Sequence, residues 1–156
     1  MTVQYKGADI PVELSSTSNT LNFIQEHIIP DLLRDDPTLQ EKIIFNKISK
    51  NSSIEKVVDR LCQKDSENHF ICIYSYGPHL QKLLSIVEIF KKVKTEKDNV
   101  KINQWTKMAM FKTVEEGRNE LLEKKTIVPI LITFITVSAS LTSPVFENDQ
   151  NMFTNQ

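Results

Sequence analysis

Four residues of metal-binding type stand close together in the sequence: Cys62, His69, Cys72 and His79. Cys62 is expected on a helix and Cys72 within a strand, so they lack the paired spacing of a zinc knuckle. Cys72 or Ser75 beside His79 would supply a nucleophile and a base, but nothing offers an orienting third group. The three glycines lie too far apart for a phosphate-binding loop. The sequence therefore predicts no metal, no cofactor and no catalytic residue.

Cations gather instead around a short loop, Ile48–Ser52, that leads into a predicted helix. Free backbone N–H groups and the positive end of a helix dipole suit a phosphate at such a position. Lys47 and Lys50 add positive charge, and Lys56 and Arg60 follow one helical turn apart. The pattern predicts a site for a nucleic-acid backbone, although an ordinary capped surface helix fits it equally well.

A second candidate is the alternating segment Lys101–Lys107. As a strand, it would place Lys101, Trp105 and Lys107 on the same face. An aromatic ring between lysines can stack on a base while the ammonium groups meet phosphates. The alternative is that Trp105 packs in the core or against a partner.

A third candidate is the segment Met108–Lys125, which we expect to be a long connection between two strands. Arg118 within it has the planar guanidinium that clamps a phosphate through two hydrogen bonds. His79 and Lys82, near the start of a second helix, are lesser candidates for RNA contact. The acidic residues of the connection fit docking onto a protein equally well.

These candidates require a framework of alternating strands and helices. A helix over Thr17–Leu33 precedes a strand over Lys42–Ile48, and Ser52–Glu55 has the spacing of a capping box. A buried strand at Phe70–Tyr74 and a helix at Pro78–Lys94 come next. The last strands are Val100–Lys107 and Thr126–Val137, where Pro129 indicates an edge position or a bulge. The fold class is α/β, in the order β-α-β-α-β-β after an N-terminal helix.

Apolar residues cover an unusually wide arc of the helix Pro78–Lys94. A helix that lies on one sheet needs a narrower stripe, so the pattern predicts a second burial surface. A partner protein is the simplest source, and the chain's own N-terminal helix is the alternative. The residues expected at the partner surface are Leu83, Ile86, Val87 and Phe90.

Charge is divided unevenly along the 156 residues. Residues 42–125 hold 17 Lys and Arg against 11 Asp and Glu, a net +6, whereas the whole chain carries −1. A basic middle of this kind suits a polyanion, though mixed charges also keep a surface soluble. The chain contains no apolar run long enough to span a bilayer. We expect an extended arm at 1–16, one RNA-binding domain at 17–137, and a loose polar tail at 138–156.

Several blocks of the sequence resemble a known family. Tyr74–Lys92, Gln104–Lys107, Glu116–Leu121 and Val128–Thr133 are similar to the smaller Alba-like protein subunits of budding-yeast RNase P and RNase MRP. The similarity runs from about Thr20 to Val137. It implies an Alba-like fold and a nuclear, nucleolar protein that is not itself an enzyme.

The resemblance also implies partners. In that family the protein forms a heterodimer with a second Alba-like subunit, and the pair grips a stem of the catalytic RNA. Expected partners are therefore RNase P RNA, RNase MRP RNA and other proteins of the two particles, and telomerase RNA is left open. One departure is that archaeal Alba proteins have a glycine- and lysine-rich loop where this chain has Lys50-Asn51-Ser52. Backbone approach to a phosphate is harder without glycine, so Lys50 corresponds by position only.

Two rival functions fit the same residues. One is a general Alba-like chromatin or RNA-binding protein that acts as a homodimer. The other is an adaptor that binds proteins alone, with its basic residues solvated. A steep loss of affinity with rising salt would distinguish RNA binding from the adaptor.

Overall fold

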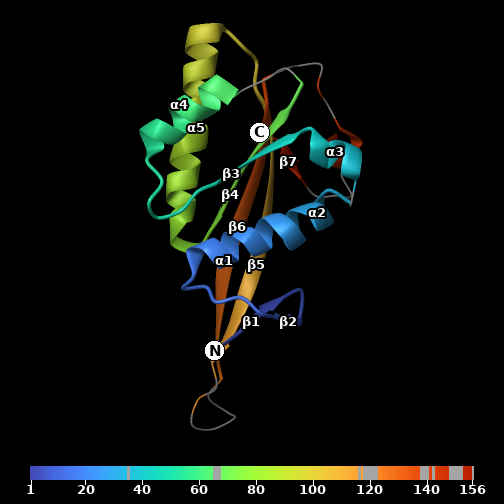
Figure 1. Ribbon diagram of the computed structural model, residues 1–156, viewed down its shortest axis with the longest axis vertical. Helices are drawn as coiled ribbons and strands as arrows, with labels where there is room; N and C mark the ends of the chain where they lie inside the picture. The colour runs from blue at the N-terminus through green and yellow to red at the C-terminus, as the bar shows by residue number, and fades with distance from the viewer. Residues whose placement is uncertain are drawn as a thin grey trace.

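The structure is a computed structural model that describes residues 1–34, 36–64, 68–115, 117, 123–137, 141, 143–147 and 153–155. A single twisted sheet runs along the long axis of the molecule, and helices cover both of its faces (Figure 1). None of the described helices is long and apolar enough to cross a membrane.

The sheet has the strand order β2-β1-β5-β6-β4-β3, and the short β7 also pairs with β5. β3 and β4 are parallel, as a helical crossover between them requires, and the other pairs are antiparallel. The strands are β1 (Thr2–Tyr5), β2 (Ala8–Ile10), β3 (Ile43–Lys47), β4 (Phe70–Tyr76), β5 (Asn103–Glu115), β6 (Lys124–Thr136) and β7 (Thr154–Asn155).

Two helices pack on one face of the sheet, α4 (Ile54–Lys64) and α5 (Leu80–Asp98), the latter preceded by a 3₁₀ turn (Gly77–His79). We call this the α4–α5 face. The opposite face carries α1 (Thr17–Phe23), a π-helix (Ile24–Ile28), α2 (Ile29–Leu32), α3 (Pro37–Glu41) and α6 (Pro144–Glu147). We call it the terminal face, because both ends of the chain build it.

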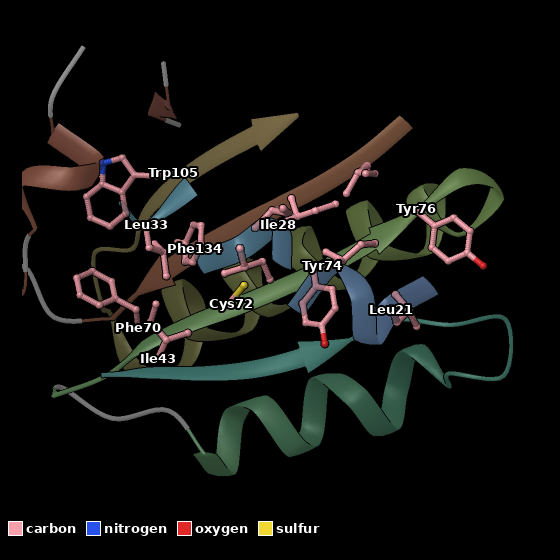
Figure 2. Packing of buried hydrophobic residues seen from close by; sticks show 14 of the residues in the cluster. Leu21, Ile28, Leu33, Ile43, Phe70, Cys72, Tyr74, Tyr76, Trp105 and Phe134 are labelled. Carbon is pink, nitrogen blue, oxygen red and sulfur yellow. The ribbon is translucent and has the colours of Figure 1, made fainter. Parts of the chain in front are cut away.

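This order confirms the predicted Alba-like β-α-β-α-β-β fold with an added N-terminal helix. The fully buried β4 separates two cores, since its alternate side chains point to opposite faces. Cys72 and Tyr74 belong to the terminal face, where Figure 2 shows them beside Ile28 and Leu21, and Ile71 and Ile73 contact α4 and α5. Pro30 does not end the N-terminal helix, because it lies in the first turn of α2, directly after the π-helix, where a missing N–H is tolerated.

The first 16 residues are not simply an extended arm. β1 and β2 form a hairpin whose two-residue turn, Lys6–Gly7, has positive φ at both positions (51° and 80°). This is the turn geometry that matches strand twist, and glycine adopts it readily. β1 pairs with β5, placing Val3 opposite Thr113 and burying it. The two strands are too short to show a clear alternation in the sequence, so their place in the sheet was not predicted.

The predicted long connection Met108–Lys125 is also corrected. β5 continues to Glu115 and β6 begins at Lys124, so most of the segment is a hairpin. Phe111 and Thr113 are buried whereas Met108 and Met110 are exposed, which is the period of a strand. Pro129 does lie at an edge locally. β4 pairs with β6 only as far as Ile130, so β6 has β5 alone beside it at Pro129.

The sequence predicted a loose C-terminal tail, but part of the tail packs against the sheet. Phe146 of α6 is 3% exposed and packs among aromatic rings of the terminal face. Its centroid lies 4.7 Å from that of Phe134 and 5.1 Å from those of Phe70 and Trp105. The tail therefore contributes to the core despite its polar composition.

Candidate nucleic-acid interface

Three of the predicted RNA-binding residues line one groove beside β3 and α4. Lys47 comes from the end of the edge strand β3, and Lys56 and Arg60 come from successive turns of α4. The groove has a volume of about 510 Å³, and Lys64 extends its row of cations. α4 presents these side chains outward because Val57, Val58 and Leu61 anchor its other side in the core.

The adjoining loop, residues 48–53, is held by hydrogen bonds to its surroundings. The buried Ser75 Oγ donates to the Ile48 carbonyl at 2.7 Å, and the Lys82 Nζ donates to the Lys50 carbonyl at 2.8 Å. Within the loop, the Ser49 N–H donates to the Ser52 Oγ at 3.0 Å. These contacts hold the loop in place without a glycine.

The predicted helix cap is displaced by one residue. α4 begins at Ile54, and the Ser53 Oγ accepts from the Lys56 N–H at 3.4 Å. Ser52, the predicted cap, closes the preceding loop instead. The N-terminus of α4 nevertheless lies where the sequence placed it, beside the cationic groove.

The lesser candidates, His79 and Lys82, lie on the other side of the same loop. Partial burial lowers the pKa of His79, and the positive charges of Lys82 and Lys50 lower it further. The hydrogen bond from the Lys82 Nζ to the Lys50 carbonyl places both lysines at this loop, close enough to influence the imidazole. Six predicted residues thus flank one loop, and we call them the basic loop surface: Lys47, Lys50, Lys56, Arg60, His79 and Lys82.

Trp105 is not available for base stacking, contrary to the principal functional prediction for it. It is 1% exposed and stacks on Phe146 with an interplanar angle of 18°. Figure 2 shows it with Phe70 and Phe134 on the terminal face. The sequence pattern suggested an exposed ring because the aromatic residue that covers it comes from the tail.

The two remaining candidates lie elsewhere. Lys107 lines a pocket between β5 and the N-terminal hairpin, and β6 and β4 lie between β5 and the strand β3 that carries Lys47. Arg118 lies outside the described residues. The sequence could not foresee this separation, because strand order is set by pairing that crosses the chain.

The predicted partner surface is buried within the chain. Leu83, Ile86, Val87 and Phe90 are at most 1% exposed, packed against the sheet and α4. The wide apolar arc of α5 is therefore explained largely by its packing against α4. The sequence pattern had indicated that a partner or the N-terminal helix would provide this second burial surface.

A different apolar surface is open. Leu84 (51% exposed) borders the same depression as Met108 (63%), and Met110 and Ile127 are also exposed. The pairings Met108–Leu131, Met110–Pro129 and Lys112–Ile127 place the strand residues on one face of the β5–β6 ribbon, since directly opposed residues project together. We call Leu84, Met108, Met110 and Ile127 the apolar strip. The sequence pattern that could have revealed the strip is the alternation of Met108 and Met110. It was missed because this segment was expected to be a connection and not a strand.

The residues of metal-binding and nucleophilic type do not assemble. Cys72 packs on the terminal face, whereas Cys62 packs against the α4–α5 core. Burial raises the pKa of the Cys72 thiol well above its usual value, and the Ser75 hydroxyl donates to a backbone carbonyl. Among the described residues, no group of three His, Cys, Asp or Glu side chains is placed to hold a metal ion.

Comparison with known proteins adds three findings. Residues 46–109 match the Alba family. The chain is 40% identical over 143 residues to the ribonucleases P/MRP protein subunit POP6 of Saccharomyces cerevisiae, covering 87% of this chain and 89% of that protein. Alba from Thermoplasma volcanium, a solved structure, is 14% identical with a TM-score of 0.35, covering 60% of this chain and 98% of that one.

Proposed function

Because this chain belongs to the POP6 family of ribonuclease P/MRP protein subunits, we propose that it is a non-catalytic RNA-binding subunit of these ribonucleoproteins. The expected ligands are a stem of RNase P RNA and the corresponding stem of RNase MRP RNA, with telomerase RNA as a further candidate. The expected location is the nucleus, chiefly the nucleolus. Its work would be to hold one RNA stem in shape and connect it to neighbouring proteins.

The basic loop surface is the observation that carries this proposal. Its cations project from two helices, a strand end and one fixed loop, so they can meet several phosphates of a helical backbone at once. Contacts of this kind position an RNA without reading its sequence, which suits recognition of a stem by shape. The rigidity of the loop lowers the entropy lost on binding.

We further propose that a second Alba-like subunit binds the apolar strip. Large apolar side chains that are exposed together on a sheet ribbon and a helix commonly mark a protein interface. The methionines adapt readily to a partner's shape. The strip replaces Leu83, Ile86, Val87 and Phe90 as the proposed contact, because those four side chains are already buried.

The test is recovery of RNA through the tagged chain, in wild type and in the double variant Lys56→Gln/Arg60→Gln. Wild type should enrich RNase P and RNase MRP RNAs together with a second small Alba-like protein. The variant should lose roughly tenfold in affinity for the stem, about 0.7 kcal/mol for each lost charge, and its salt dependence should become shallower. Lys92→Gln/Lys97→Gln removes the same charge from exposed positions on α5 and serves as the matched control.

Other outcomes would assign another function. Recovery of diverse RNA or chromatin without these particles would favour a general Alba-like protein. Recovery of proteins alone, insensitive to salt, would favour the adaptor. Turnover of an RNA substrate by the purified chain would overturn the non-catalytic assignment.

A further inference from the structure

A pocket of about 590 Å³ lies at the edge of the sheet farthest from the basic loop surface. Its walls are the β1–β2 turn, the end of α2, and β5 from Lys107 to Lys112. β1 pairs with β5 at 112–114 and β7 pairs at 105–106. In the described strands, the β5 residues between these pairings have no neighbour on this side, and the pocket occupies that gap.

Cations converge on the pocket from distant parts of the chain. Four line it, Lys6, Arg34, Lys107 and Lys112, and among the described residues Asp31 is the one carboxylate that lines it with them. Asp31 accepts a hydrogen bond from the Lys6 Nζ at 2.5 Å. An excess of positive charge in a concave site concentrates the field and attracts anions.

The composition of the N-terminal segment makes this convergence specific. Residues 1–41 contain seven Asp and Glu but just two basic residues, Lys6 and Arg34, and both line the pocket. Each has a positive φ (51° and 57°), an uncommon conformation for a residue with a side chain. Both residues precede the segment 46–109 that matches the Alba family, so the pocket joins an N-terminal addition to β5 residues of the matched segment, among them Lys107.

The pocket also offers apolar surface for a ring. Leu32 and Ala109 contribute to its lining, and Tyr5 brings an aromatic ring with the Lys6 Nζ 5.7 Å from its centroid. The Tyr5 ring is supported from behind by Phe111, in an edge-to-face contact at 6.4 Å. A ring fixed beside several cations is the arrangement that binds a base and its phosphates together.

We propose that this pocket binds a short single-stranded segment of RNA, with phosphates on Arg34, Lys107 and Lys112 and a base against Tyr5. The proposal rests on the proposed RNA-binding function and adds a second contact on the opposite edge of the sheet. Its volume suits a nucleotide unit, within the ~300–1,000 Å³ of small-ligand pockets. An acidic peptide is disfavoured, since an extended chain pairing with β5 would meet β1 at one end of the gap and β7 at the other.

Fluorescence anisotropy with the full-length chain and labelled oligouridylate of about eight nucleotides tests the proposal. Arg34→Asn/Lys107→Gln should weaken binding about tenfold or more. Asparagine is chosen at position 34 because it tolerates the left-handed backbone there. Lys56→Gln/Arg60→Gln should reduce the affinity for the stem more than the affinity for oligouridylate. Lys92→Gln/Lys97→Gln controls for net charge, and an unchanged unfolding midpoint confirms that each variant is folded.

Photo-crosslinking of 4-thiouridine in the same oligonucleotide, with mapping by mass spectrometry, locates the contact. Crosslinks at Tyr5 or β5 are expected, and Tyr5→Leu should reduce them. Unchanged oligouridylate affinity in Arg34→Asn/Lys107→Gln would overturn this site, while the loss of stem binding in Lys56→Gln/Arg60→Gln would leave the proposed function standing. Loss of a protein partner with retained oligouridylate affinity would also overturn it, in favour of an acidic peptide.

Discussion

The two faces of the sheet were built from different kinds of sequence. The α4–α5 face comes mainly from the stretch 48–90, in which strands and helices alternate with clear periods, together with Leu131 and Ile135 of β6, and its buried core is aliphatic except for Phe90. The terminal face is assembled from both ends of the chain and is rich in aromatic rings, including Phe70, Trp105 and Phe146. The first face is local and the second depends on contacts between distant segments, so the two should respond differently to mutation.

Replacing Phe146 by Ala should have the largest effect on stability. Its ring contacts four other aromatic rings, and truncation of a buried Phe typically costs about 3–5 kcal/mol. Urea unfolding should show the loss, and the fluorescence of Trp105 should shift toward that of an exposed indole. Val145→Ala, one residue away and only partly buried, is the matched control. A loss below about 1 kcal/mol for Phe146→Ala would contradict the docking of the tail.

The same contrast explains which parts of the fold the sequence could predict. Strong periodicity identified β3, α4, β4 and α5, since each element carries its own pattern. The N-terminal hairpin and α6 were missed because their strands and turns are too short to show a period. Trp105 was misread for the same reason, since its cover lies some forty residues away in the sequence at Phe146.

The candidate site could be predicted only in part, for a related reason. The six residues of the basic loop surface lie within or beside one loop and the starts of two helices, where sequence proximity ensures spatial proximity. The position of Lys107 depended on strand order, and the open apolar strip depended on where α5 stops covering the ribbon. Neither feature can be predicted from the spacing of nearby residues.

Charge placed in the apolar strip should weaken dimer formation with the proposed partner while leaving the fold intact. Met110→Asp sets a carboxylate on a face that a partner would desolvate, at a cost of about 2 kcal/mol or more, or roughly thirtyfold in affinity. Analytical ultracentrifugation of the co-purified pair measures it. Lys112→Asp, two residues along the same strand face, introduces the same group beside the strip and should have a smaller effect. Equal affinities for wild type and Met110→Asp would place the interface elsewhere.

Tyr74→Phe tests how firmly the N-terminal helix is tied to the terminal face. The Tyr74 hydroxyl donates to the Gln25 Oε1 at 2.6 Å, and burial raises the pKa of this phenol, so it remains a donor across the accessible pH range. Removing one such bond should cost about 1 kcal/mol in unfolding free energy. Hydrogen exchange should increase first in α1 and the π-helix. Cys72→Ser, a neighbouring change on the same strand face, would instead disturb the core without releasing the helix.

The smallest expected effect is a pH dependence of RNA binding at the basic loop surface. Burial and the charges of Lys82 and Lys50 hold the pKa of His79 below its usual 6.5, so the imidazole is neutral at pH 7 in the free protein. A bound phosphate would favour the imidazolium and raise that pKa in the complex. Affinity should therefore rise as pH falls through the interval between the two pKa values, by about threefold, and stay flat above it. His79→Gln should remove this rise while preserving affinity at pH 8, and a rise that persists in the variant would show that His79 does not face the RNA.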